Sequence, residues 1–320
     1  MRSQLRDWAL LIFCNMIWGS GFVMSKQAQR QAGPVFTTFF PITLATLALI
    51  PIVYYQNKKA NKRNPSFRLP GRDIIAFVVI GLFGQLVTQF FSNWGVRLSL
   101  ASNGALLMLT LPVSTAIMAY FLLGERMTWV RWVSFAFAIA GVLECSGIDW
   151  KNVNMTSSRF MTGNILLFIS VLSSAFYNVY SKRLLRRYSP FQVLLYSYVA
   201  LFVFMLPLVI YVEPEGFRNL PTYTGVVWLG LLLLAIFQYF LSMVILLSVL
   251  TRLDATQAGL TNYLIPFFGL VAAGVVLHER VTLAMILGGV LVLASTLLVT
   301  VYEQHLESKA REAVVASRIR

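Results

Sequence analysis

Long apolar runs and short polar segments alternate along the whole chain. A helix of about 20 apolar residues crosses the roughly 30 Å hydrocarbon core of a bilayer. Each run is expected to be a helix, because an open sheet edge in lipid leaves backbone groups without hydrogen-bond partners. The pattern predicts an all-α integral membrane protein with ten spans, near residues 8–27, 35–55, 73–96, 101–122, 129–148, 160–181, 190–212, 223–248, 255–277 and 283–302.

The composition agrees with this class. Of the 320 residues, 58% are hydrophobic and 12% are charged, whereas a soluble domain carries about 25% charged residues. The net charge of +14 would suit a nucleic-acid partner, but it also suits cytoplasmic loops that orient the spans. With the N-terminus inside, 19 of the 26 Lys and Arg residues fall in cytoplasmic segments. We therefore expect the lipid bilayer and no nucleic acid as partner, with both termini cytoplasmic in the plasma membrane (the inner membrane in a bacterium).

One stretch of the sequence occurs twice. "LPVSTAIMAYFLLGERMT" at 111–128 corresponds to "IPFFGLVAAGVVLHERVT" at 265–282, which places Pro112 and Pro266 154 residues apart. The ten spans therefore read as two copies of five, and the odd number inverts the second copy. Inverted repeats are typical of secondary transporters, whose halves move around a central site. We expect a first repeat at 1–148, an external linker at 149–159, a second repeat at 160–303 and a cytoplasmic tail at 304–320.

The stretches "IWGSGFVMSKQ", "LLGERMTWVRWVSFAFAIAGVL" and "VLHERVTLAMILGGVLVLAS" carry a family resemblance. With them, nearly the whole chain resembles the drug/metabolite transporter superfamily, in particular its EamA-type members. The resemblance implies a ten-helix exporter of amino acids and other small metabolites, with a central cavity walled by both halves. Glu144 departs from the family pattern, which usually has an apolar residue there, and we expect it to lie at the membrane interface.

Polar side chains recur on one face of several spans. Gln85, Gln89 and Asn93 follow one another at a spacing of four, which places them on one side of a helix. Such groups can serve as hydrogen bonds between helices, but a stripe of amides favours a cavity wall. The predicted cavity residues are Trp18, Gln85, Gln89, Thr110, Ser114, Tyr177, Asn178, Gln238, Tyr239, Asn262 and Tyr263. Trp18 can equally pack against the opposing helix.

Pro112 and Pro266 each lie near the middle of a span. Proline lacks an N–H and clashes with the carbonyl four residues earlier, so the carbonyls of Met108 and Asn262 are expected to be weakened or free. Free carbonyls at this depth are tolerated only in contact with protein or a wet cavity. The pair predicts a kinked gate on the transport pathway, and a purely structural bend is the alternative.

No Asp, Glu or His lies in the middle third of any predicted span. The sequence also lacks a metal-ligand set, a phosphate-binding loop and a catalytic triad, so we expect no enzyme, no cofactor and no metal site. A neutral or zwitterionic small molecule suits such an interior. The alternatives are a flippase for lipids or lipid-linked sugars, a membrane enzyme, and a scaffold or receptor. Small residues predict close helix packing, within the chain or in a homodimer, at Ser134, Ala138, Gly141, Ala284, Gly288 and Ser295.

Overall fold

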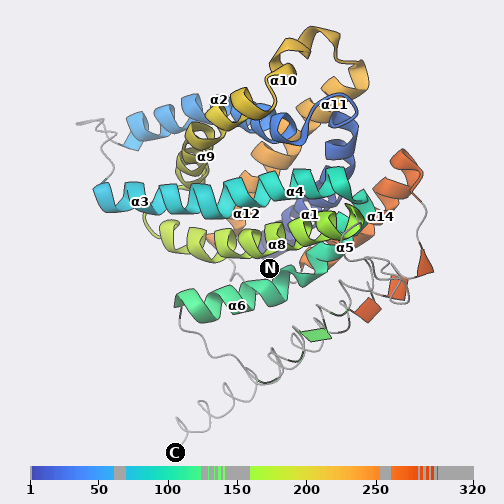
Figure 1. The fold of residues 1–320 in the computed structure, drawn as a ribbon. Coiled ribbons are helices and arrows are strands. Elements are labelled where there is room, and N and C mark those ends of the chain that lie inside the picture. The colour runs from blue at the N-terminus through green and yellow to red at the C-terminus, as the bar shows by residue number, and fades with distance from the viewer. Residues whose placement is uncertain are drawn as a thin grey trace, which may run out of the picture.

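The computed structural model describes residues 2–60, 70–123, 159–252 and 261–279, with isolated positions between 129 and 140 and between 282 and 294. Within these residues the chain forms helices and turns and no strand (Figure 1). The fifth and tenth predicted spans and Glu144 lie outside this described part, apart from the isolated positions. The small-residue faces of those two spans therefore stay a prediction.

In the described part of the chain, six helices are long and apolar enough to cross a membrane. They are Arg6–Ala28, Pro34–Lys59, Gly71–Leu98, Phe160–Leu184, Pro190–Val212 and Gly225–Leu250, and Leu264–Leu277 is a shorter apolar helix. Each of the six agrees within a few residues with a predicted span. The all-helical class is thereby confirmed for the described residues, and the lengths and apolar composition of these helices agree with a multi-pass membrane protein.

The first half of the chain begins with two unbroken helices, and its later helices are interrupted. The elements are α1 (Arg2–Ala28), α2 (Pro34–Ala60), α3 (Gly71–Val79), η1 (Ile80–Leu86), α4 (Val87–Leu98), α5 (Ala101–Leu107), η2 (Met108–Thr110) and α6 (Leu111–Leu123). The second half follows a similar order among its described residues, with a short helix and a 3₁₀ turn added after α9. Its elements are α8 (Arg159–Leu184), α9 (Pro190–Val212), α10 (Glu215–Arg218), η3 (Leu220–Thr222), α11 (Gly225–Leu233), η4 (Leu234–Leu241), α12 (Ser242–Leu250), η5 (Thr261–Tyr263) and α14 (Leu264–Leu277).

Local sequence explains where helix α9 begins. Ser189 accepts a hydrogen bond from the backbone N–H of Gln192 at 3.3 Å, and the Gln192 side chain accepts one from the Ser189 N–H at 2.8 Å. This reciprocal capping satisfies two N–H groups that have no partner within the helix. Pro190 follows at the first helical position, where its missing N–H costs nothing.

Two helices contain π-helical segments at corresponding places. Segment η1 joins α3 to α4, and η4 joins α11 to α12. Their first residues, Ile80 and Leu234, are 154 residues apart, which is also the spacing of Pro112 and Pro266. Wide π-helical turns are rare and are frequently found at functional sites.

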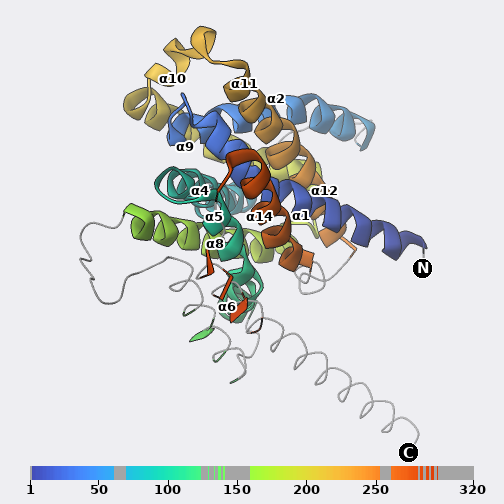
Figure 2. The ribbon, with the colours of Figure 1, turned by 90° about the vertical axis from the view of Figure 1, so that its right-hand side faces the viewer.

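Two 3₁₀ turns mark the positions at which the sequence predicts kinks. Turn η2 directly precedes α6, which contains Pro112, and turn η5 directly precedes α14, which contains Pro266. The two turns contact each other. Helix α14 also lies along α1, as Figures 1 and 2 both show. A Cβ on Gly19 would lie 2.6 Å from the Ile265 carbonyl oxygen, so this close approach requires glycine.

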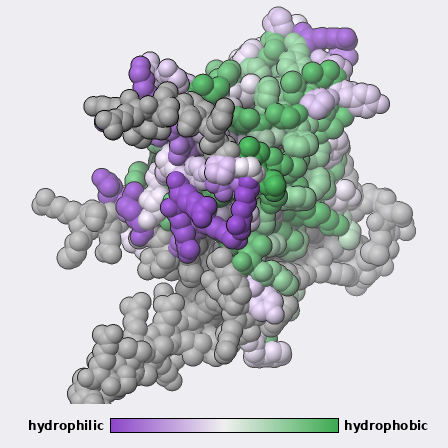
Figure 3. Space-filling model, turned by 90° about the vertical axis from the view of Figure 1, so that its left-hand side faces the viewer, coloured by the Kyte–Doolittle hydropathy of each residue, from purple (hydrophilic) through white to green (hydrophobic). Residues whose placement is uncertain are grey.

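The helices run between two ends of different character. At the basic end, α2 and α8 terminate and α3 and α9 begin (Figure 1, left). Figure 3 views this end and shows hydrophilic residues gathered beside a hydrophobic area. Its described basic residues include Lys58, Lys59, Arg72, Arg183, Arg186 and Arg187. At the opposite end, here called the capped end, α1, α4 and α9 terminate and α2 and α5 begin.

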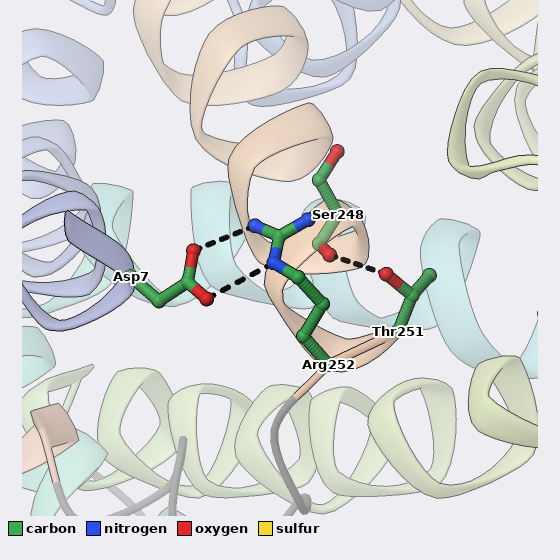
Figure 4. A network of polar contacts seen from close by, with 4 residues as sticks. All are labelled: Asp7, Ser248, Thr251 and Arg252. Carbon is green, nitrogen blue, oxygen red and sulfur yellow. Dashed lines mark hydrogen bonds and ion pairs between the residues drawn. The ribbon is translucent and has the colours of Figure 1, made fainter. Parts of the chain in front are cut away.

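An ion pair with a buried carboxylate joins the two halves at the basic end. Arg252, after α12, donates to both carboxylate oxygens of Asp7 in α1, from Nε at 3.0 Å and from Nη2 at 2.7 Å (Figure 4). The Asp7 side chain is only 4% exposed, whereas that of Arg252 is 41% exposed. The two-pronged geometry fixes the start of α1 against the end of α12.

Candidate functional site

A polar cavity of about 60 Å³ lies in the middle of the bundle, between helices of both halves. Elements α1, η1, α4 and η2 wall it from the first half, and α8, η4 and α12 wall it from the second. The lining residues are Trp18, Gly21, Phe22, Ser25, Gly84, Gln85, Thr88, Gln89, Ser92, Asn93, Met108, Ser170, Ser174, Tyr177, Asn178, Leu234, Gln238, Tyr239, Met243 and Leu246. These side chains offer amides, hydroxyls and aromatic rings, and none of them is charged.

Seven of the predicted cavity residues meet here. They are Trp18, Gln85, Gln89, Tyr177, Asn178, Gln238 and Tyr239. Thr110, Ser114 and Asn262 are buried but do not line the cavity, and the side chain of Tyr263 lies outside the described part of the structure. Neither Pro112 nor Pro266 lines it. Among the described side chains of the two helix breaks, only Met108 reaches the cavity.

The indole of Trp18 is held by the other half of the chain. Its Nε1 donates to the Ser242 hydroxyl at 3.0 Å, and that hydroxyl donates to the Gln238 carbonyl at 2.5 Å. The second bond ties Ser242 to the π-helical segment η4. Trp18 thus lines the cavity and is also held against a helix of the opposing half.

Asn93 connects four elements beside the cavity. Its Nδ2 lies 2.9 Å from the Thr38 hydroxyl of α2, 3.0 Å from the Gln89 carbonyl and 3.1 Å from the Tyr239 hydroxyl of η4. Its Oδ1 accepts from the Ser25 hydroxyl of α1. Asn93 lies on the predicted amide stripe, and its partners on α1, α2 and η4 are visible only in the fold.

Two polar atoms at the cavity have no hydrogen-bond partner among the described residues. They are the Tyr177 hydroxyl and the Oε1 of Gln238, both buried. Buried polar groups in proteins are nearly always paired, and an unpaired one costs about 1–3 kcal/mol. The two atoms point to a ligand or water as their missing partner. They come from different elements, α8 and η4.

Layers of polar contacts close the cavity toward the capped end. Gln29 donates to the Ser25 hydroxyl at 3.0 Å and to the Asn93 carbonyl at 2.8 Å. Farther out, Lys26 donates to the Ser99 carbonyl at 2.6 Å, and the Ser99 hydroxyl donates to Asn164 at 2.5 Å. The last contact joins the first half of the chain to α8 of the second.

Two glutamates continue this closure at the capped end. Glu213, after α9, accepts from the backbone N–H of Val35 at 3.2 Å and of Phe36 at 2.8 Å, at the start of α2. Glu279, after α14, accepts in the same way from the start of α5. The described contacts of the Glu279 side chain thus run to the other half of the chain. A carboxylate stabilises a helix N-terminus because the unpaired N–H groups carry partial positive charge.

Several features of the site have no recognisable signal in the sequence. The π-helical turns that present Gln85 and Gln238 contain no proline to announce them. Gly21 and Gly84 leave room for side chains of the other half. A Cβ on Gly21 would lie 2.4 Å from the Gln238 Oε1, and a Cβ on Gly84 would lie 3.0 Å from the Tyr177 ring. Such contacts depend on how the halves pack.

Known proteins that resemble this chain over most of its length are named as transporters. A protein of Streptantibioticus cattleyicolor named "Probable terminal-alkyne amino-acid exporter" is 28% identical over 303 residues, which are 93% of this chain and 94% of the relative. A "S-adenosylmethionine uptake transporter" of Rickettsia felis is 24% identical over 295 residues, or 91% of each chain. One crystal structure has the same fold, with a TM-score of 0.64 at 18% identity over 93% of this chain and 98% of its own.

The model of the EamA-like transporter family matches residues 7–145 and again residues 161–301. The two matches cover most of the chain, and they confirm the resemblance to EamA-type members of the drug/metabolite transporter superfamily. Members of this family are transporters, which are not enzymes, and they act on small molecules in a membrane. The chain therefore belongs to the EamA-like transporter family.

Proposed function

We propose that this protein is a secondary transporter that exports small neutral or zwitterionic metabolites, such as amino acids, by alternating access. The observation that carries the proposal is the uncharged polar cavity between the two halves. A solute with net charge would lose its hydration there without a countercharge, which costs several kcal/mol. A zwitterion has opposite charges that amides can accommodate, because each amide offers both a donor and an acceptor.

The orphaned atoms suggest how such a solute binds. An ammonium group would donate to the Gln238 Oε1 and to the Tyr177 hydroxyl, the two buried atoms without partners. The amide N–H groups of Gln85 and Asn178 would donate to a carboxylate, and the ring of Trp18 would cover an apolar side chain. The relative named as an amino-acid exporter supports this solute class.

The full architecture belongs to the same proposal. We infer ten spans in two inverted repeats, at 1–148 and 160–303, with the external linker at 149–159, the tail at 304–320 and both termini cytoplasmic. The 154-residue spacing of the π-helical segments and of the prolines supports the repeat, and so do the two family matches. The basic end is then cytoplasmic and the capped end external. A homodimer stays a prediction.

The size and the closure of the cavity support alternating access. A volume of about 60 Å³ is well below the roughly 300–1,000 Å³ of pockets that hold drug-sized ligands. A solute therefore enters only when spans move apart. The breaks at Pro112 and Pro266 touch each other across the two halves, and we propose that they are the points about which α6 and α14 bend.

Solute counterflow in reconstituted vesicles tests the proposal. Vesicles loaded with unlabelled amino acids should accumulate the matching labelled amino acid, and Thr88→Val should slow this uptake. The matched control is Thr43→Val, since Thr43 is also a half-buried helical threonine but bonds only to its own helix, at the Phe39 carbonyl. Equal rates in the two variants would contradict the placement of the site. Exchange of S-adenosylmethionine or of lipid-linked sugar in place of amino acids would overturn the solute class.

Orientation has its own test. Single cysteines at Arg186 and at Arg218, which lie at opposite ends of α9, should react with an impermeant reagent from the cytoplasm and from outside, respectively. Reaction of both from one side would refute the inverted arrangement.

A further inference from the structure

A second hollow lies at the basic end, between α3 and α8, and shares no residue with the transport cavity. It has a volume of about 400 Å³. The residues that line it are Arg72, Asp73, Ile75, Ala76, Tyr180, Arg183, Leu184, Arg186 and Arg187. We call it the arginine recess. Figure 3 faces this end of the molecule, where hydrophilic residues border the hydrophobic surface.

The charge of the arginine recess is strongly positive. Its single carboxylate, on Asp73, accepts a 2.6 Å hydrogen bond from the Tyr188 hydroxyl and lies 3.9 Å from Nη1 of Arg187. The recess therefore has four arginines and one acid. Arg72, Arg183 and Arg186 form no ion pair among the described residues. Four like charges around one hollow repel one another, so an anion would relieve the repulsion.

The recess also straddles the edge of the membrane-spanning segments. The span Gly71–Leu98 begins here and the span Phe160–Leu184 ends here. Ile75, on the recess wall, is 66% exposed, and its neighbour Ile74 is 47% exposed. These side chains belong to the lipid-facing surface. Arg72 and Arg183 lie in the terminal turns of the two spans, and Arg186 and Arg187 lie just beyond the second span. One ligand would thus meet guanidinium groups at one end and apolar side chains at the other.

We propose that the arginine recess binds the phosphodiester headgroup of an anionic bilayer lipid, with an acyl chain along the Ile74–Ile75 surface. Arginine is suited to this role because its planar fork donates two parallel hydrogen bonds to phosphate oxygens. Basic pockets between spans on the cytoplasmic side recognise anionic headgroups in the same manner. A zwitterionic headgroup carries an ammonium group that the four arginines would repel.

The position of the recess gives such a lipid a consequence for transport. Arg72 lies in the first turn of α3 in the first half, and Arg183 lies in the last turn of α8 in the second. Both spans extend from there to the walls of the transport cavity. A phosphate held between them joins the halves at the basic end. The bound lipid would therefore favour the form in which this end is closed.

Lipid binding to the purified protein in detergent tests the proposal. Native mass spectrometry would count bound phosphatidylglycerol and phosphatidylcholine on the wild type and on Arg183→Gln/Arg186→Gln. The control is Lys58→Gln/Lys59→Gln, which removes the same charge from exposed positions at the same end. We expect retained phosphatidylglycerol on the wild type and the control, and at least a fivefold loss on the arginine variant.

The other outcomes each overturn part of the proposal. Equal loss in both variants would show diffuse attraction to the basic end instead of a site. Equal retention of phosphatidylcholine would exclude recognition of net charge. A thermal shift produced as strongly by inorganic phosphate as by phosphatidylglycerol would make the recess a free phosphate site. Since the recess shares no residue with the transport cavity, none of these results depends on the proposed solute.

Discussion

Glu279 accepts two hydrogen bonds from Ser102, one from its backbone N–H at 3.0 Å and one from its hydroxyl at 2.7 Å. The same carboxylate accepts from the N–H of Ala101 at 3.1 Å. Glu213 bonds the start of α2 with identical sequence separations of 178 and 177 residues. In both cases an acid from the second half caps a helix of the first half. The two caps must break for the halves to separate at this end.

Removing a cap should open the capped end more often. Glu279→Ala leaves the N–H groups of Ala101 and Ser102 without their acceptor, and such a cap contributes about 0.5–2 kcal/mol. We expect a several-fold faster alkylation of a cysteine placed at Ser92 in the cavity wall, in a background in which both native cysteines are serine. The control is Glu215→Ala at the same end, since Glu215 is exposed and pairs only with Arg218 at 3.9 Å. An unchanged rate in Glu279→Ala would contradict the capping role.

The second cap should respond to pH. Burial raises the pKa of Glu213, although the N–H groups of Phe36 and Val35 and the charge of Arg97 act to lower it, and Tyr223 also faces the carboxylate. A raised pKa in the folded form means that its stabilisation is complete below the ordinary glutamate pKa and declines as pH rises through the raised value. We expect the melting temperature to fall over this acidic range, and Glu213→Gln to remove that part of the decline. A pH profile unaffected by the substitution would refute the assignment.

Gly21→Ala should impair transport with little effect on folding. Its Cβ would lie 2.4 Å from the Gln238 Oε1, so the flexible end of that side chain must leave its place in the cavity. We expect a raised KM in vesicle uptake, with an expression level close to the parent. Gly274→Ala is the matched control, because α14 leaves open space around that glycine. An equal KM in the two variants would show that Gln238 does not contribute to solute binding.

The ion pair between Asp7 and Arg252 should be measurable in a double-mutant cycle. Asp7→Asn removes the charge that two arginine donors contact, and hydrogen bonds to charged groups contribute roughly 1.5–3 kcal/mol each. We expect the loss of stability to lie at the low end of this range, since Arg252 is 41% exposed and can bond to water instead. We expect Asp7→Asn and Arg252→Gln each to lower the melting temperature, and the double variant to lower it by less than their sum. Strict additivity would show that the pair contributes nothing.

The spans were predictable because lipid imposes a simple rule on sequence. The predicted span 190–212 coincides with α9, and 160–181 lies within α8. Hydrophobic length decides where such helices begin and end, whatever their neighbours do. The interruptions within the helices were harder to predict from the sequence. Proline indicated the breaks near Pro112 and Pro266, but nothing local indicated η1 or η4.

The cavity was predictable only as far as polar stripes reveal it. Gln85, Gln89 and Asn178 lie among apolar residues of their spans, where a polar side chain is costly and therefore indicates a function. Thr110 and Ser114 satisfy the same criterion, yet they are fully buried away from the cavity. Thr110 donates to the Leu107 carbonyl three residues earlier at 2.8 Å, so its hydroxyl has a partner without reaching the cavity. Which polar face meets the cavity depends on how each span is rotated by packing.

The wide turns of η1 set that rotation for α4. Each residue of an α-helix advances the chain by about 100°, so a segment with wider turns offsets the faces of the helices on its two sides. Gln89 and Asn93 of α4 therefore face the cavity because η1 sets the rotation of α4 about its axis. The length of this span is therefore restricted more tightly than its hydrophobicity requires. Loss of one residue between Ile80 and Leu86 would leave a helix still long enough to cross the bilayer, with Gln89 and Asn93 turned toward the wrong neighbours.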